Sequence, residues 1–269
     1  MIVEGSPVTD KYFEKYELKK FAQLNNIQLF NINKESNWLT FNGINQNNKP
    51  LKIRYSQTVA NSFCISLTVP KTHANTGISL SLKNMMGIIH PSDKKLMHGL
   101  SENITLRDRK ILSSAWWKKH KNIGYIMSNI SGIYFRLFGW RFISSYQKKV
   151  LLQNYHVISL NLFKLSKTIY PNLSIIDAFD CMEGQGPWFG NIVNLKTFVC
   201  SMDFLAADNT MCKIMGINPN SIKYLQLINK DRKTSLKVNY PLLNPKTTKR
   251  YCNHHSNYLI FTHQDNNIN

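Results

Sequence analysis

The sequence lacks any pair of cysteines spaced closely enough to form a metal-binding motif. Zinc ribbons and ferredoxin-type iron–sulfur sites both use Cys-x-x-Cys spacings, and none occurs here. We therefore expect no iron–sulfur cluster from the cysteines of this chain. An odd number of scattered cysteines also fits a reducing compartment. The five are Cys64, Cys181, Cys200, Cys212 and Cys252.

A secretory signal and a long apolar run are also missing. Residues 1–10 show no basic segment followed by an apolar one. The most apolar stretch, 123–143, is interrupted by Arg136 and Arg141, which makes it too polar for a membrane span. We expect a cytoplasmic protein without a membrane span.

Acidic residues are scarce, with 15 Asp and Glu against 34 Lys and Arg, for a formal net charge of +19. None lies between Asp108 and Asp177. Such a balance favours acidic partners, including nucleic acid and small anions. Residues 107–155 combine basic and aromatic side chains, and we predict a basic helical insertion there. It could serve as a nucleic-acid or protein binding module, although the helical spacing of its aromatic residues is also typical of a core.

Hydrophobic residues make up 43% of the chain, enough for a buried core. Strand patterns alternate with helix patterns, so we expect an α/β fold with a mostly parallel sheet flanked by helices. Residues 62–69 are continuously β-prone, which predicts a strand buried on both faces. Residues 203–215 predict a helix that ends at Gly216. We expect one domain over 1–229 and a polar extension over 230–269.

The first candidate segment of a functional site follows the strand pattern at 62–69. In parallel sheets, ligands bind beyond the carboxyl ends of strands. Lys71 and Lys83 could neutralise a carboxylate or phosphate, with Asn84 adding directional hydrogen bonds. His73 could act as a general acid or base. The alternative is an ordinary surface loop of a basic protein.

The second candidate segment follows a strand pattern that ends at residue 176. Asp177 and Glu183 could transfer protons, bind a metal or pair with the lysines. Gly184, Gly186 and Gly190 permit close approach of the backbone to a ligand. A tight turn whose carboxylates balance nearby lysines would explain the same residues. The sequence does not identify the metal, if any, or the substrate and reaction.

These segments together resemble the family catalogued as domain of unknown function 362. The similarity runs from about residue 3 to residue 227. The motifs that carry it are Pro70-Lys71-Thr72-His73, Leu82-Lys83-Asn84-Met85-Met86-Gly87, Ile176-Asp177, Met182-Glu183-Gly184-Gln185-Gly186-Pro187 with Gly190, Ser201-Met202-Asp203, Ala206-Ala207-Asp208 and Met215-Gly216-Ile217-Asn218-Pro219.

The resemblance implies an association with iron–sulfur proteins, because many members carry a C-terminal ferredoxin-like module. This chain departs from that pattern, since Cys252 is the single cysteine of its C-terminal region. A separate ferredoxin or another partner chain could take the place of the module. Members also usually begin with an extra strand and helix, so we expect a chain that is short at the N-terminus. No settled catalytic mechanism comes with the resemblance.

Overall fold

The computed structural model describes residues 1–73, 75–99, 145–187 and 189–232. The strands are β1 (Ile2–Glu4), β2 (Leu29–Asn31), β3 (Trp38–Ile44), β4 (Pro50–Ser56), β5 (Ile65–Thr68), β6 (Lys71–His73), β7 (Gly77–Ser79), β8 (Leu173–Ala178), β9 (Cys181–Gln185), β10 (Phe189–Val193) and β11 (Thr197–Ser201).

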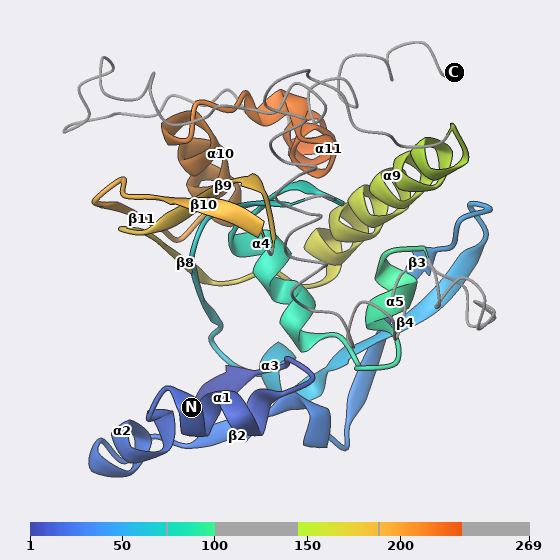
Figure 1. Ribbon diagram of the computed structural model, residues 1–269. Helices are drawn as coiled ribbons and strands as arrows, with labels where there is room; N and C mark the ends of the chain where they lie inside the picture. The colour runs from blue at the N-terminus through green and yellow to red at the C-terminus, as the bar shows by residue number, and fades with distance from the viewer. Residues whose placement is uncertain (74, 100–144, 188, 233–269) are drawn as a thin grey trace, which may run out of the picture.

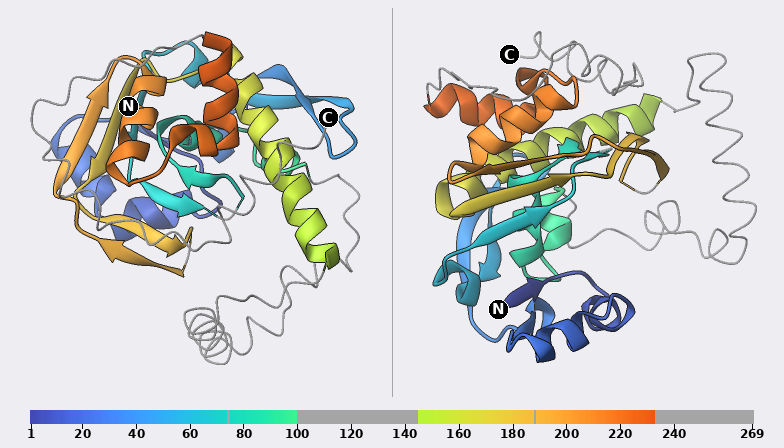
Figure 2. Two further views of the ribbon diagram at one scale, coloured as in Figure 1. Left: turned by 90° about the horizontal axis from the view of Figure 1, so that it is seen from above. Right: turned by 90° about the vertical axis from the view of Figure 1, so that its left-hand side faces the viewer.

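The α-helices are α1 (Thr9–Lys15), α2 (Leu18–Leu24), α3 (Gln57–Ala60), α4 (Ser81–Asn84), α5 (Lys94–Met97), α9 (Ser145–Thr168), α10 (Phe204–Ile214) and α11 (Lys223–Arg232), with 3-10 turns at Ile32–Lys34, Met85–Ile88 and Pro219–Ser221. Figure 1 and the right-hand view of Figure 2 place α9, α10 and α11 on one side of the strands. The N-terminal helices α1 and α2 lie on the opposite side, and α4 lies between. No helix in the described ranges is long and apolar enough to cross a membrane.

The strands form mixed sheets, so the prediction of a mostly parallel sheet is wrong. Pairs β1–β2, β5–β8 and β6–β9 are parallel, whereas β3–β4, β6–β7, β8–β11 and β9–β10 are antiparallel. A parallel pair needs a crossover of a dozen or more residues, whereas a hairpin needs only a short turn. Four strands follow one another between Leu173 and Ser201 without an intervening helix. β9 and β10 therefore pair as an antiparallel hairpin, and β11 returns to pair antiparallel with β8. The α/β class itself is confirmed.

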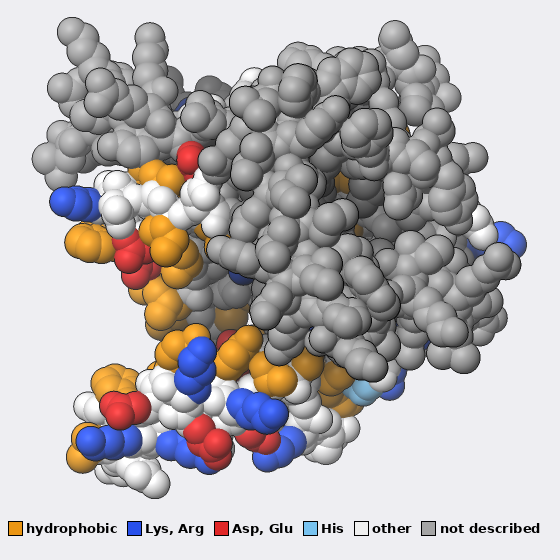
Figure 3. All heavy atoms as spheres, viewed as in Figure 1, with side chains coloured by type: hydrophobic (Ala, Val, Ile, Leu, Met, Phe, Trp, Pro, Cys, Tyr) orange, Lys and Arg blue, Asp and Glu red, His pale blue; other side chains and the backbone are white. Residues whose placement is uncertain are grey.

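The prediction that residues 62–69 form a strand buried on both faces is also wrong. β5 is shorter and belongs to a three-stranded sheet of order β11–β8–β5. Ser66 is buried, but Ile65 and Leu67 are 54% and 66% exposed, and Phe198 on β11 is 72% exposed. Apolar side chains are visible at the surface on the left of Figure 3, the side on which Figure 1 labels β10 and β11. One face of this sheet therefore carries exposed apolar side chains.

Helix α9 joins the distant parts of the core. Ile158, Leu162 and Leu165 are fully buried within the main hydrophobic cluster. Asn161 is also buried: its Oδ1 accepts a hydrogen bond from Ile44 N at 2.8 Å, and its Nδ2 donates to Ile44 O at 3.0 Å. Hydrogen bonds from this buried amide therefore hold α9 against β3, in addition to the apolar packing of the helix.

Helix α10 begins and ends where the sequence predicts. Asp203 is its N-cap, and Oδ1 of this residue accepts a hydrogen bond from Leu205 N at 2.9 Å. Gly216 follows the helix with φ of +70°, and Ile217 N donates to Cys212 O, as in a glycine-terminated helix end.

The insertion predicted at 107–155 lies mostly outside the described residues. Its residues 107–144 are not described, and its residues 145–155 belong to α9. Most of the predicted extension at 230–269 also lies outside the described residues.

Candidate functional site

The two candidate segments lie side by side in the four-stranded sheet. β6 pairs with β9 in parallel, with Lys71 opposite Met182. Met182 N also donates a hydrogen bond to Pro70 O at 3.1 Å. Residues more than a hundred positions apart in the chain therefore become neighbours at the centre of one sheet, because β5 and β8 run parallel just before them.

The glycines of the second segment allow β9 to approach β6 closely. Thr72 Oγ1 donates to Gly184 O at 3.0 Å and accepts from Gly186 N at 3.3 Å. A Cβ atom on Gly186 would lie 1.9 Å from Thr72 O, and one on Gly190 would lie 2.3 Å from Glu183 O. These contacts explain Gly186 and Gly190 by packing between strands. Ligand binding by Gly184, Gly186 and Gly190 stays a prediction.

Lys83 carries the clearest electrostatic signature in this region. It follows β7 on the short helix α4 and is partly buried. Burial, followed by the nearby charges of Lys71 and Lys94, lowers the pKa of its ammonium to about 8. Below that pH the protonated Lys83 must therefore be held in a partly desolvated place against two like charges.

His73 faces the same charges from the end of β6. Its Nδ1 accepts a hydrogen bond from Asn75 N at 3.0 Å, so the neutral ring carries its proton on Nε2. Burial and the charges of Lys83, His98 and Lys71 lower the pKa of His73 to about 3. At neutral pH the ring is uncharged and presents an N–H donor.

His98 is a member of this group that the sequence did not indicate. It follows α5, and Nδ2 of Asn75 lies 3.5 Å from its Nδ1, at the limit of hydrogen-bond length. Burial and the charge of Lys83 lower the pKa of His98 to about 4. We call Lys71, His73, Lys83 and His98 the cationic cluster. His98 has no motif around it, and only the fold brings it to the cluster.

Within the described part of the chain, the charges that act on Lys83, His73 and His98 are all cationic or imidazole groups. A carboxylate beside any of these groups would favour its protonated form and raise its pKa. The cluster therefore gathers nitrogen donors around two lysines, and the groups that shift these three pKa values are themselves basic. Such an arrangement suits an oxyanion ligand.

The hydrogen bonds of Asn84 and Asp177 go to residues outside the cluster. Asn84 Nδ2 donates to Ser66 Oγ at 3.1 Å and to Leu67 O at 3.2 Å, which ties α4 to β5. Asp177 is exposed at the end of β8, where its Oδ1 accepts a hydrogen bond from Phe179 N. Glu183 follows Met182, the residue that pairs with Lys71, so its side chain leaves β9 on the opposite face from that pair. The catalytic roles of Asp177 and Glu183 stay predictions.

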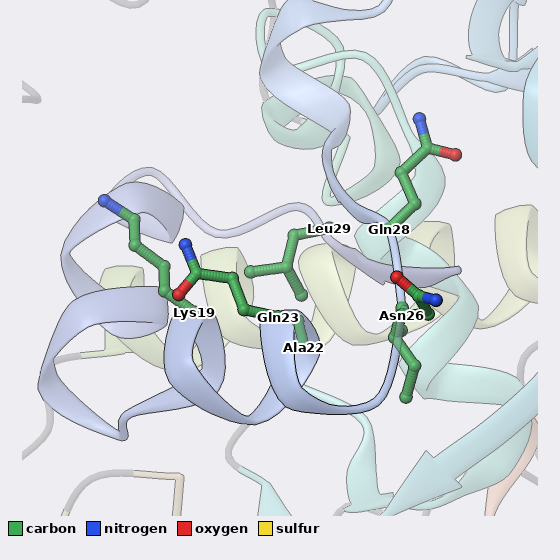
Figure 4. Close-up of a pocket in the computed structure, with 7 residues that line it drawn as sticks. Lys19, Ala22, Gln23, Asn26, Gln28 and Leu29 are labelled. Atoms are coloured by element: carbon green, nitrogen blue, oxygen red, sulfur yellow. The ribbon is translucent and has the colours of Figure 1, made fainter.

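A metal-ion cluster and a surface hollow are the alternatives to the cationic cluster among the described residues. No group of three or more His, Cys, Asp or Glu side chains is placed there to hold a metal ion. A shallow hollow between α2 and β2 is lined by Lys19, Gln23, Asn26 and apolar neighbours (Figure 4). It contains a single charged side chain, so it resembles the predicted anion site less than the cationic cluster does.

Comparison with known proteins gives one match. The family model described as Domain of unknown function (DUF362) matches residues 1–213. Neither the curated proteins nor the solved structures contain a significant match. The matched range includes both candidate segments and the whole cationic cluster.

Proposed function

The chain belongs to the domain of unknown function 362 family, and we propose that it binds a small anion in the cationic cluster. The anion is a phosphate or a carboxylate. The family description itself names no activity. The observation that carries the proposal is the state of Lys83. Its pKa is lowered to about 8 by burial and by neighbouring lysines, with no carboxylate among the described groups that act on it. A bound oxyanion would place a negative charge beside Lys83.

The donors of the cluster match an oxyanion in kind as well as in charge. Lysine ammonium groups donate hydrogen bonds and accept none. The neutral His73 ring donates from Nε2 because Nδ1 is occupied by the Asn75 amide. A ligand with several acceptor oxygens can use all of these groups, whereas a cation or a neutral donor cannot.

Acid–base chemistry is the finer part of the proposal. Glu183, on the strand that pairs with β6, is the carboxylate that we propose for it. His73 is a weaker one in this conformation, since its low pKa and occupied Nδ1 favour hydrogen-bond donation over proton uptake. Two alternative readings remain predictions: binding of nucleic acid or protein by residues 107–155, and dependence on a separate ferredoxin.

The test compares Lys83→Met with Lys52→Met, which removes an exposed lysine of β4. Phosphate at about 100 times its Kd should stabilise the wild-type protein by about 2.7 kcal/mol in thermal unfolding. Lys52→Met should behave like wild type, and Lys83→Met should bind at least about tenfold more weakly by calorimetry. Native mass spectrometry of the wild-type protein should show the bound anion.

Two outcomes would contradict the proposal that the cationic cluster binds an anion. Equal stabilisation of wild type and Lys83→Met by phosphate would indicate a general salt effect and would remove the basis of the proposal. The absence of saturable binding of phosphate, sulfate and acetate to the wild-type protein would do the same.

A further inference from the structure

Helix α4 carries Lys83, yet it has no cap of its own. Its N-cap residue is Leu80, which provides no side-chain hydrogen bond. The first amides of any helix lack partners within the helix and need another acceptor. In α4 these are the amides of Ser81 and Leu82, both of which are buried. Their acceptor must therefore come from elsewhere in the fold.

Asp208 supplies that acceptor from helix α10. Its Oδ1 accepts a hydrogen bond from Ser81 N at 2.9 Å, and its Oδ2 accepts one from Leu82 N at 3.1 Å. The side chain is fully buried. Burial raises the pKa of Asp208 to about 7, and the two backbone amides act in the opposite direction. Both oxygens of one buried carboxyl group thus hold the two residues immediately before Lys83.

A second set of contacts holds the same helix to the three-stranded sheet. Ser81 Oγ lies 2.6 Å from Ser174 Oγ on β8, and Ser66 Oγ donates to Ser81 O at 3.1 Å. Asn84 Nδ2 donates to Ser66 Oγ at the other end of α4. Lys83 lies between these anchors, so a shift of α4 would move its ammonium relative to Lys71 and His73.

We propose that Asp208 is a positioning residue of the cationic cluster: through the backbone amides of Ser81 and Leu82 it fixes α4 so that Lys83 meets Lys71 and the two histidines. The inference rests on the proposed function. Asp208 contacts the start of the helix rather than the ligand. Preorganised donors bind more tightly because they lose less freedom on binding.

The experiment compares Asp208→Asn with Asn209→Ala. An asparagine retains the size of Asp208, but its amide nitrogen cannot accept a hydrogen bond, so one amide of α4 loses its acceptor. Asn209 is the next residue of α10, is equally buried, and hydrogen-bonds to Asn229 on α11. Its removal therefore loosens the same helix without touching α4.

Two readouts are measured: the Kd for inorganic phosphate, and the pKa of Lys83 from NMR of its Cε, assigned with Lys83→Arg. Asp208→Asn should raise the Kd about tenfold and move the pKa of Lys83 from about 8 towards its ordinary value. Asn209→Ala should lose stability while the Kd stays within about twofold and the pKa stays unchanged. A loss of folding stability alone would not change the Kd and the Lys83 pKa in one variant and leave both unchanged in the other.

The proposal is overturned if Asp208→Asn keeps the wild-type Kd and Lys83 pKa, or if Asn209→Ala alters both equally. Should Asp208→Asn fail to fold, Ser174→Ala removes the contact of the Ser81 hydroxyl with β8 and should produce a smaller change in the same direction; no change would overturn the idea. If wild type binds no anion, the proposed function fails, and the pKa of Lys83 still decides the role of Asp208.

Discussion

Gly186 is predicted from the sequence to line a ligand site, but in the structure it packs against a neighbouring strand. The Gly-x-Gly turn suggests close approach of the backbone to a ligand. In the structure the backbone approaches the neighbouring strand, with Gly186 N donating to Thr72 Oγ1. A common site for Lys71, His73 and Lys83 stays a prediction, and the charges of both lysines act on His73.

Gly186→Ala should destabilise the protein by about 3 kcal/mol or prevent folding, because its Cβ would lie 1.9 Å from the backbone oxygen of Thr72. Gly87→Ala is the control, since no atom lies within 4 Å of the position that its Cβ would take. Urea unfolding measures both. Equal stability of the two variants would show that β9 and β6 do not pack in this way.

At the scale of the elements, periodicity predicted helices better than it predicted strand burial. The helix at 203–215 and its end at Gly216 were predicted because helix signals are local, and the structure adds Asp203 as the N-cap. Burial of a strand depends on what covers each face, which is a long-range property. The run at 62–69 therefore suggested a doubly buried strand, whereas β5 buries Ser66 and exposes Leu67.

The difference in burial predicts that substitutions at two apolar positions of this sheet will change the free energy of unfolding by different amounts. Leu67→Gln should change the free energy of unfolding by less than about 0.5 kcal/mol, because Leu67 is 66% exposed. Ile176→Ala on β8 should cost about 2–4 kcal/mol, since Ile176 is fully buried. Chemical denaturation provides both values. A cost above about 2 kcal/mol for Leu67→Gln would mean that this face is covered in solution.

At the scale of the whole molecule, buried histidines should make stability sensitive to acid. The pKa of His98 is about 4 in the folded protein, below its ordinary value of 6.5. As the pH falls, the unfolded state takes up this proton first. The stability that neutral His98 contributes is therefore fully present above about pH 6.5 and is lost as the pH falls towards 4.

His98→Gln should accordingly lose less stability than wild type between pH 6.5 and pH 4, as measured by urea unfolding at several pH values. Asp208 titrates in the same window with the opposite sign, because its folded pKa is raised to about 7. It is present in both proteins and cancels in the comparison. Parallel curves for the two proteins would contradict the burial of His98.

The sequence by itself determined the family, the α/β class and the two polar segments, because these depend on residue types and spacings along the chain. It also excluded a cluster motif, since no two cysteines are closely spaced. Only the tertiary structure decided the mixed sheets, the addition of His98 to the cationic cluster and the contact of Asp208 with α4. Each of these joins residues distant in sequence, and short-range patterns carry no information about such contacts.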